Sequence, residues 1–189
     1  MAIMQDSQGF MWFGTEDGLD RYDGYELRHF IHRPGDPSTL PNNWVSALAR
    51  DSTGTLWIGS DGGGLRWHDT EAGRFSPIRL EHDPALAEAS SNIRFLFEDA
   101  QHRLWVATRS TGIELIDASR RSARSFRHDP SDPASLSDDS VFAVTQDSHG
   151  AIWAGTAAGL DKIDPQSGRV EAFGQQLLAQ GRRLRASPR

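Results

Sequence analysis

The 189-residue sequence has no cysteine, so no disulfide bond contributes to its stability. Cysteine-free chains occur both in the cytosol and in export compartments, and this absence does not decide between them. The sequence also lacks an apolar run of 18 residues, which excludes a typical membrane-spanning helix, and its N-terminus shows no signal-peptide pattern. Sustained helical periodicity is missing too, except for hints at 85–89 and after 175.

Basic residues are outnumbered, with 20 Lys and Arg against 26 Asp and Glu, and the net charge of −6 argues against nucleic acid as a partner. The seven histidines form no pair at metal-ligand spacing, and no serine lies in Gly-x-Ser-x-Gly. The glycine-rich stretch 61–64 lacks the Gly-Lys-Ser/Thr of a phosphate loop. Asp132, Asp138 and Asp139 could contribute to a calcium site, although turn capping accounts for them better. We therefore expect no cofactor, no metal and no catalysis.

The sequence does contain a fourfold internal repeat. In each copy an aspartate is followed six residues later by a tryptophan, and a small residue comes two positions after that. The tryptophans, 45, 48 and 48 residues apart, are Trp12, Trp57, Trp105 and Trp153. A phenylalanine closes each copy, at Phe30, Phe75, Phe126 and Phe173. Self-similarity at this period indicates one supersecondary unit copied along the chain.

Four short strands can be assigned to each unit. In the second unit they are 44–50, 55–60, 64–69 and 74–80, with turn signals between them. Four strands every ~40–50 residues are typical of a propeller blade. We therefore predict an all-β, propeller-type array of four antiparallel four-stranded blades, open and incomplete. The expected blades are 1–31, 43–80, 92–127 and 140–174, joined by linkers, and 175–189 is expected to be a disordered, arginine-rich tail.

The repeated positions have physical explanations. Asp51 and Gly54 bracket a tight turn, where the aspartate caps and the glycine supplies a positive φ. In the third unit His102 takes the place of that glycine. The strand after the turn is apolar on both faces, so we expect sheets to cover it on both sides. Gly59 suggests a close backbone approach. The four repeated tryptophans are expected to pack between blades rather than to stack on sugars.

Several segments resemble the two-component regulator propeller repeat. The segments 5–25, 51–65 and 147–160 carry its Asp-x-x-Gly turn, its Trp-x-Gly strand and its Gly-Leu pair. The linkers His32–Leu40 and His128–Leu136 resemble the segments that join blades in that family. The resemblance covers about residues 2–174.

This resemblance implies the extracytoplasmic, periplasmic sensor region of a bacterial membrane receptor whose output domain is a histidine kinase or a diguanylate cyclase. Such sensors usually carry two seven-bladed propellers, whereas this chain has four units, so it is expected to be a fragment or a truncated gene product. Its membrane link would run through missing parts of a parent receptor. The function implied is sensing of a carbohydrate or other small molecule, without catalysis. A protein-interaction scaffold and a glycan-acting propeller enzyme are the alternatives, and exposed blade faces favour self-association.

The expected binding surface lies on the rim of the longer loops. In such a blade, the loops between the second and third strands share a rim with the inter-blade linkers, and function tends to lie on variable loops held by a rigid scaffold. The candidate ligand-binding residues on this rim are Asn43, Trp44, Asp61, Arg94, Arg109 and Asp139.

Overall fold

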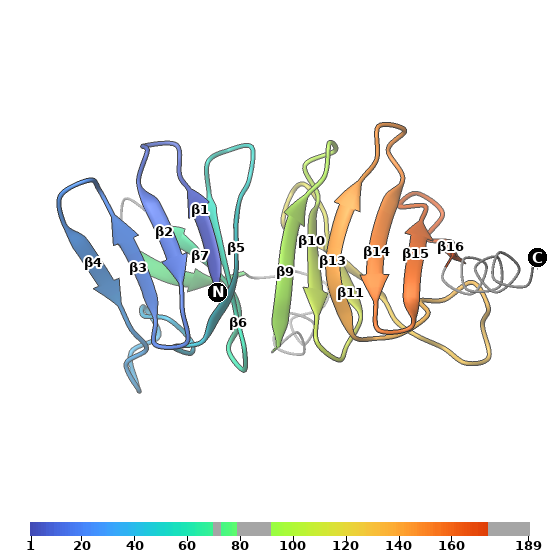
Figure 1. Cartoon of the computed structure of the whole chain (residues 1–189), viewed down its shortest axis with the longest axis horizontal. Coiled ribbons are helices and arrows are strands. Elements are labelled where there is room, and N and C mark those ends of the chain that lie inside the picture. Colours follow the sequence, from blue (N-terminus) through green and yellow to red (C-terminus); the bar gives the residue numbers. More distant parts are fainter. Residues whose placement is uncertain (70–72, 79–91, 174–189) are drawn as a thin grey trace, which may run out of the picture.

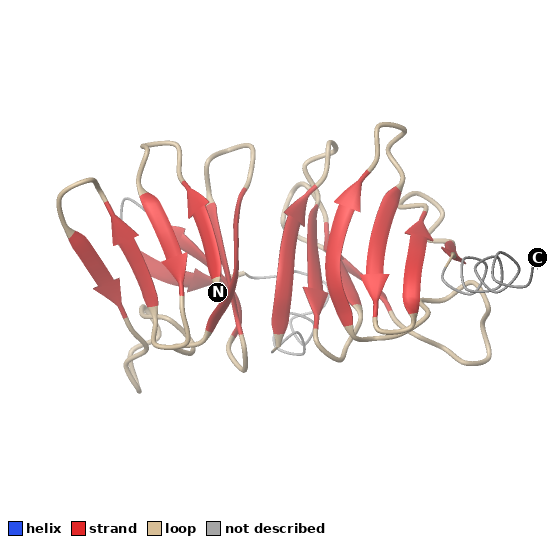
Figure 2. Ribbon diagram, viewed as in Figure 1, coloured by secondary structure: helices blue, strands red, loops and turns tan. Residues whose placement is uncertain are grey.

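The computed structural model describes residues 1–69, 73–78 and 92–173, and every regular element in them is a strand (Figures 1 and 2). The expected helical hint at 85–89 and the tail 175–189 lie outside the described residues. Sixteen strands form four antiparallel sheets of four consecutive strands each. The predicted fold class is confirmed.

The first and second sheets hold β1 to β8. Their bounds are β1 (Ala2–Gln5), β2 (Met11–Gly14), β3 (Leu19–Tyr22), β4 (Leu27–Phe30), β5 (Val45–Arg50), β6 (Leu56–Ser60), β7 (Gly64–Asp69) and β8 (Arg74–Pro77). The third and fourth sheets hold β9 (Ile93–Glu98), β10 (Leu104–Thr108), β11 (Ile113–Ile116), β12 (Ala123–Phe126), β13 (Val141–Gln146), β14 (Ile152–Thr156), β15 (Gly159–Ile163) and β16 (Val170–Ala172).

The four sheets stack side by side, and the leading strand of each lies next to the leading strand of the following one, from β1 through β5 and β9 to β13. Figure 1 shows the first and fourth sheets at opposite ends of the array, so the array is open. The tight turns run along its upper edge in that view, and the longer loops and linkers run along its lower edge.

The apolar core lies between the sheets. Side chains alternate along each strand, so neighbouring residues of β10 point to different neighbours: Leu104 and Val106 face the second sheet, while Trp105 faces the fourth. Three separate core clusters result, one for each junction between adjacent sheets. Because a single sheet of this size has no interior of its own, each blade depends on its neighbours for burial.

A small residue on the second strand lets the next sheet approach closely. A Cβ on Gly14 would lie 2.7 Å from Cγ1 of Val45 in the second sheet, and one on Gly59 would collide with Ile93 in the third. Distances of this kind are not tolerated between real atoms, so glycine is required by contact rather than by backbone angle. The predicted close approach at Gly59 is confirmed.

Each repeat aspartate joins its turn to its tryptophan. In the third sheet, Oδ1 of Asp99 accepts hydrogen bonds from the amides of Gln101 and Arg103, and Oδ2 accepts one from the Trp105 indole at 2.8 Å. The other three sheets repeat this indole bond at 2.7 to 2.8 Å, in the pairs Asp6–Trp12, Asp51–Trp57 and Asp147–Trp153. Every carboxylate is thereby satisfied, which a buried charge requires.

These bonds favour the ionised carboxylate. The hydrogen bond from the Trp153 indole, together with those from the turn amides, lowers the pKa of Asp147 below its ordinary value. Burial by itself would raise the pKa of Asp51, but hydrogen bonds from Thr53, Trp57 and Thr55 outweigh it and the pKa is lowered. In the second and fourth sheets the turn–indole link is therefore strongest when the aspartate is charged.

Two turns of the third sheet depart from the repeat. His102 has a φ of 60° where the other sheets have Gly9, Gly54 and Gly150, as expected from the sequence, and Arg120 has a φ of 60° in the β11–β12 turn. Arg120 donates to Asp51 and to Glu98 at 3.3 Å each and lies over the Trp57 ring. The side chain of Arg120 thus links the third sheet to the second. These contacts offset the conformational free energy that the left-handed backbone of Arg120 costs.

One residue of the phenylalanine column is misplaced in the sequence-based alignment. Phe30 and Phe126 stack on the tryptophans of their own sheets, with ring centroids 5.7 and 5.6 Å apart. Phe75 instead points to the first sheet, where its ring lies 5.4 Å from that of Phe30. Ile78 occupies the equivalent position in the second sheet and packs with Trp57. Phe75 lies three residues before Ile78, the position that is equivalent to Phe30 and Phe126. This shift is visible only in the strand register.

His68 is a buried titratable group beside this aromatic cluster. It is 7% exposed and contacts Phe75 and Trp12 at ring-centroid distances of 5.1 and 5.3 Å. Burial lowers the pKa of His68, and the positive charge of Arg21 adds to the effect. The folded state therefore holds this imidazole neutral.

The tryptophans at the junctions are expected to contribute strongly to stability. Trp105 is fully buried, so Trp105→Ala should lower the free energy of unfolding by about 3–5 kcal/mol. Urea unfolding followed by circular dichroism measures this. Trp44→Ala is the control, because Trp44 is 42% exposed and its loss should cost less than about 1 kcal/mol. Equal losses in the two variants would contradict burial at the junction as the source of stability.

His68 should make stability depend on pH in the mildly acidic range. Its lowered pKa means that the unfolded chain binds the proton first, so its contribution is present above the unfolded pKa of about 6.5 and is lost as pH falls through the lower folded pKa. We expect the urea midpoint to fall between about pH 7.5 and pH 5.5 more for the wild type than for His68→Phe. An identical fall in both proteins would rule out His68 as the cause.

Candidate functional site

The loops between second and third strands and the starts of the leading strands meet on the long-loop rim. The amide of Asp61 donates to the carbonyl of Trp44, and the amide of Arg109 donates to that of Asn92. Ala157 repeats the bond with Ser140 in the fourth sheet. The second, third and fourth blades thus present this loop beside the start of their own leading strand, which holds the rim side chains on a rigid frame.

Asn43 and Asp139 each bind the linker that precedes them. Oδ1 of Asn43 accepts from the amide of His32 at 2.6 Å, and Oδ1 of Asp139 accepts from that of His128 at 2.7 Å. In both linkers the histidine Nδ1 also donates to a leucine carbonyl at 2.6 Å. The shared spacing from histidine to Asn43 and Asp139, visible in the sequence, was the signal for this capping role.

The same linkers are anchored by buried leucines. Leu40 and Leu136 are each 1% exposed, and backbone bonds tie the linkers to the fourth strands of the following sheets, from Phe75 to Ser38 and from Val170 to Ala134. The two described linkers are therefore anchored to the following sheet, although most of their other residues are exposed or only partly buried.

Asp61 and Arg109 are brought together across two sheets. An Arg109 guanidinium nitrogen lies 3.2 Å from Oδ2 of Asp61, and the Arg109 side chain is 51% exposed. The amide of Gly62 donates to the Asn92 side chain at 2.8 Å, which fixes the same corner. The arrangement places a carboxylate and a guanidinium, both partly open to solvent, at one point of the rim.

Arg94 lies at the next junction. Its guanidinium is 4.4 Å from the ring centroid of Phe142 and 3.4 Å from the Ser140 hydroxyl. Phe142 is 51% exposed, an unusual state for a large apolar side chain, and sequence reasoning did not select it. Trp44, exposed to 42%, lies beside Asp61 on the preceding part of the rim. We refer to these side chains of the long-loop rim together as the rim strip: Trp44, Asp61, Arg94, Arg109 and Phe142.

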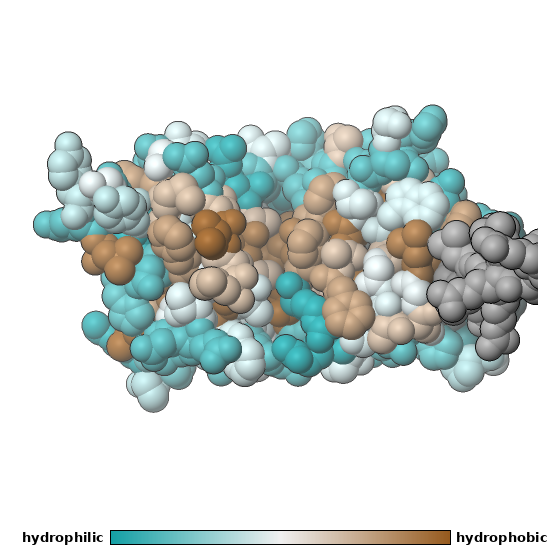
Figure 3. All heavy atoms as spheres, viewed as in Figure 1, coloured by the Kyte–Doolittle hydropathy of each residue, from teal (hydrophilic) through white to brown (hydrophobic). Residues whose placement is uncertain are grey.

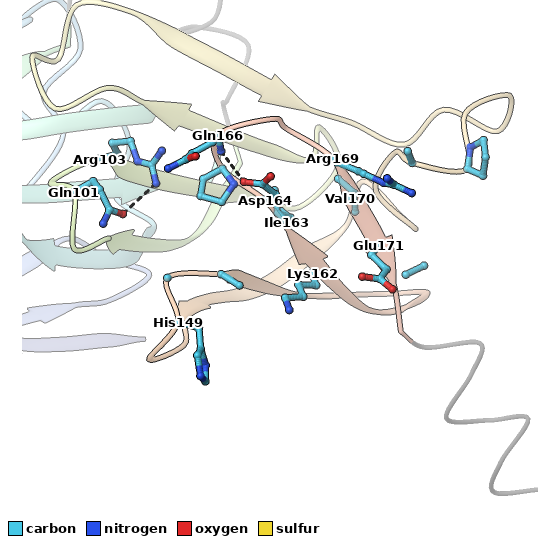
Figure 4. A pocket seen from close by; sticks show the side chains of 16 residues that line it. Gln101, Arg103, His149, Lys162, Ile163, Asp164, Gln166, Arg169, Val170 and Glu171 are labelled. Carbon is cyan, nitrogen blue, oxygen red and sulfur yellow. Dashed lines mark hydrogen bonds between the residues drawn. The ribbon is translucent and has the colours of Figure 1, made fainter.

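A large pocket lined by described residues lies away from this strip. It has a volume of ≈ 1000 Å³ and is bordered by the turns of the third and fourth sheets and by β15 and β16 (Figure 4). Several polar side chains that line it bind residues close to them in sequence. Arg103 donates hydrogen bonds to Asp99 and Gln101. Asp164 caps its own turn by accepting hydrogen bonds from Gln166 and Ser167. In Figure 4 the His149 side chain points away from Arg169 and Glu171. The pocket therefore offers no convergent set of groups.

Within the described ranges, no cluster of three or more His, Cys, Asp or Glu side chains is arranged to hold a metal ion. None of the described segments forms a helix able to span a membrane.

Four segments of the chain, 1–17, 39–62, 87–110 and 135–158, match the two-component regulator propeller family. The chain is built from the repeats of this family. The segments begin near each leading strand and contain every Asp–Trp pair, so the repeat recognised in sequence is the repeat that folds into a blade.

Known proteins with related sequence or fold are larger than this chain. Histidine kinase P4 of Formosa agariphila is 29% identical over 83 residues, which are 43% of this chain and 6% of that protein. The extracellular domain of the putative hybrid two-component system BT3049 of B. thetaiotaomicron has a TM-score of 0.77 at 23% identity, over 92% of this chain and 24% of that one.

An enzyme shares the fold as well. Virginiamycin B lyase of Staphylococcus aureus has a TM-score of 0.64 at 15% identity, over 92% of this chain and 55% of the lyase. At such identities the likeness concerns the fold alone. The propeller architecture is thus common to sensor regions and to a lyase.

The Asp61–Arg109 pair should contribute little to folding. Because the Arg109 side chain is 51% exposed and solvent screens the pair, Asp61→Ala and Arg109→Ala should each change the free energy of unfolding by less than about 1 kcal/mol. Chemical denaturation of both variants and of the double variant measures this. A loss well above that value would assign the pair to the structure instead of to the surface chemistry of the rim.

Proposed function

We propose that this chain is a ligand-sensing propeller module from the extracytoplasmic, periplasmic region of a bacterial membrane signalling receptor, and that it has no catalytic activity. Its membership of the regulator propeller family supports the signalling role. The names of similar proteins, a histidine kinase and the extracellular domain of a hybrid two-component system, agree with it.

The rim strip is the proposed binding surface, and it carries the proposal. It combines two exposed aromatic side chains, Trp44 and Phe142, with two guanidinium groups and one carboxylate. Partly desolvated aromatic and arginine side chains are the groups that contribute most to recognition. Asn43 and Asp139 support the strip by fixing the linkers that precede β5 and β13.

The small molecule expected here, a carbohydrate being one candidate, would bridge neighbouring blades. Arg109 and Asp61 belong to the third and second sheets, and Arg94 and Phe142 to the third and fourth. A ligand that contacts both sides of a junction stabilises one arrangement of the blades over another, and binding can then be coupled to a change elsewhere in a receptor.

A thermal-shift screen with neutral oligosaccharides, acidic oligosaccharides and amino acids tests the proposal. A ligand at about 100 times its Kd should raise the Tm by roughly 5–10 °C. The shift should shrink in Trp44→Ala, Arg94→Ala and Arg109→Ala. It should persist in Gln8→Ala, which changes an exposed residue on the opposite rim.

Two outcomes would contradict this function. A stabilising small molecule whose effect survives all three rim variants would bind elsewhere. A response to protein partners alone would favour the interaction scaffold.

A further inference from the structure

A cavity lies among the tight turns, between the second and third sheets, and we call it the turn-rim cavity. It has a volume of ≈ 620 Å³, within the range of roughly 300–1,000 Å³ that small-molecule sites occupy. Trp57, Trp67, Ile78 and Ala118 form the apolar part of its lining. Hydrophilic side chains dominate the turn rim on the face seen in Figure 3, so an apolar lining here is a departure from the surroundings. The cavity shares no lining residue with the rim strip.

The cavity arises where one turn residue of the second sheet is small. Thr55 takes the place of Phe10 in the first sheet and of Arg103 in the third, since the amide of each donates to Oδ1 of its repeat aspartate. In the first sheet the Phe10 ring fills this place and lies 4.6 Å from Cζ of Arg21. A threonine leaves the place open, so the space beside Trp57 can hold a flat ring.

Trp67 supplies an aromatic wall for such a ring. It lies opposite Trp57 in the β6–β7 pair and is only partly buried. The residues at this position in the other sheets are Arg21, Leu115 and Lys162. Among the described residues none accepts a hydrogen bond from Nε1 of Trp67, whereas each repeat tryptophan donates to an aspartate. Trp67 therefore offers both a ring and a donor to a ligand.

Two residues with a left-handed backbone converge on the same cavity. His102 and Arg120, each with a φ of 60°, are the non-glycine residues of positive φ in the described part of the chain, and both line the cavity. The corresponding turns of the other sheets contain glycines of positive φ, namely Gly9, Gly54 and Gly150 for His102 and Gly24, Gly73 and Gly168 for Arg120. Residues held in this region of the backbone cluster at ligand-binding sites, where the side chain and not the turn requires them.

The charged groups of the lining favour a neutral or cationic ligand. Nη2 of Arg120 donates to Oδ2 of Asp51 and to Oε1 of Glu98, at 3.3 Å each. Two carboxylates of the lining thus share one guanidinium, and an anionic ligand would meet an excess of negative charge. A hydroxyl or an ammonium group finds acceptors instead, in Glu98 and in the hydroxyls of Ser52 and Thr53.

We propose that the turn-rim cavity binds a small molecule through an aromatic ring that carries a neutral or cationic polar group. The ring lies against Trp67, in the space that corresponds to Phe10 of the first sheet, and the polar group binds Glu98 or the turn hydroxyls. The lining residues come from two sheets, so the ligand stabilises the junction between them. This site is independent of the function proposed for the rim strip.

Three compounds that share one ring and differ in charge test the ligand class: tyramine, tyrosol and para-hydroxyphenylacetate, which are cationic, neutral and anionic at neutral pH. NMR titrations of the isotope-labelled full chain follow the indole N–H signals of its six tryptophans. Tyramine and tyrosol should bind with a Kd on the order of 1 mM and shift the signal of Trp67 more than that of Trp44. Para-hydroxyphenylacetate should bind at least about ten-fold more weakly.

A substitution that fills the cavity locates the site. Thr55→Phe gives the second sheet the ring that the first sheet has at this place, and it should raise the Kd of tyrosol at least about ten-fold without lowering the Tm. Ala151→Phe makes the equivalent change in the fourth sheet, outside the cavity, and is the matched control, which should bind tyrosol like the wild type. Trp67→Leu, the residue type of the third sheet at this position, should weaken binding by a similar factor.

Three results would overturn the proposal. None of the three compounds binds with a Kd below about 10 mM; or para-hydroxyphenylacetate binds as tightly as tyramine; or Thr55→Phe and Trp67→Leu, each shown by circular dichroism to be folded, bind tyrosol as tightly as the wild type. Trp67→Leu decides the last point if Thr55→Phe does not fold. Signal shifts confined to Trp44 would assign the compounds to the rim strip and would likewise contradict a site in the turn-rim cavity.

Discussion

The structure depends on one constraint: none of its four sheets can bury its apolar side chains alone. Each of the first three sheets places a tryptophan against the next sheet, and in the third sheet Asp99 on the adjoining turn accepts the indole N–H and two turn amides. The carboxylate thereby fixes the turn and the ring in a single arrangement. Because the same unit recurs, the core is a series of layers between sheets, and stability grows with each junction formed.

This arrangement divides the surface into parts with different roles. The turn rim is occupied by the hydrogen bonds that hold the indoles, and in the third sheet Arg120 extends that network into the second sheet. The long-loop rim differs from the turn rim because it carries exposed aromatic and charged side chains, which lie where adjacent blades meet. The first and the fourth sheet each have one face that no described sheet covers.

Much of the fold could be predicted because the repeat keeps chemically distinctive residues in register. Asp51, Gly54 and Trp57 identify a turn and the strand after it, and the second-unit strands agree with the observed bounds within a few residues. The sequence-based alignment placed Phe75 in the phenylalanine column incorrectly. The sequence shows an aromatic residue close to the expected position, but it does not show on which face of the sheet that residue lies. Asn43 and Asp139 remain predicted ligand groups, and the structure adds that Oδ1 of each accepts from a histidine amide eleven residues earlier.

The sequence by itself determined the number of blades, their strand order and the identity of the junction tryptophans, because local turn chemistry and strand alternation encode these features over short distances. Only the tertiary structure decided which rim side chains meet, such as Arg94 with Phe142 and Asp61 with Arg109. Those relations join residues about 48 positions apart or more. They follow from the twist and stacking of whole sheets, which no local pattern specifies.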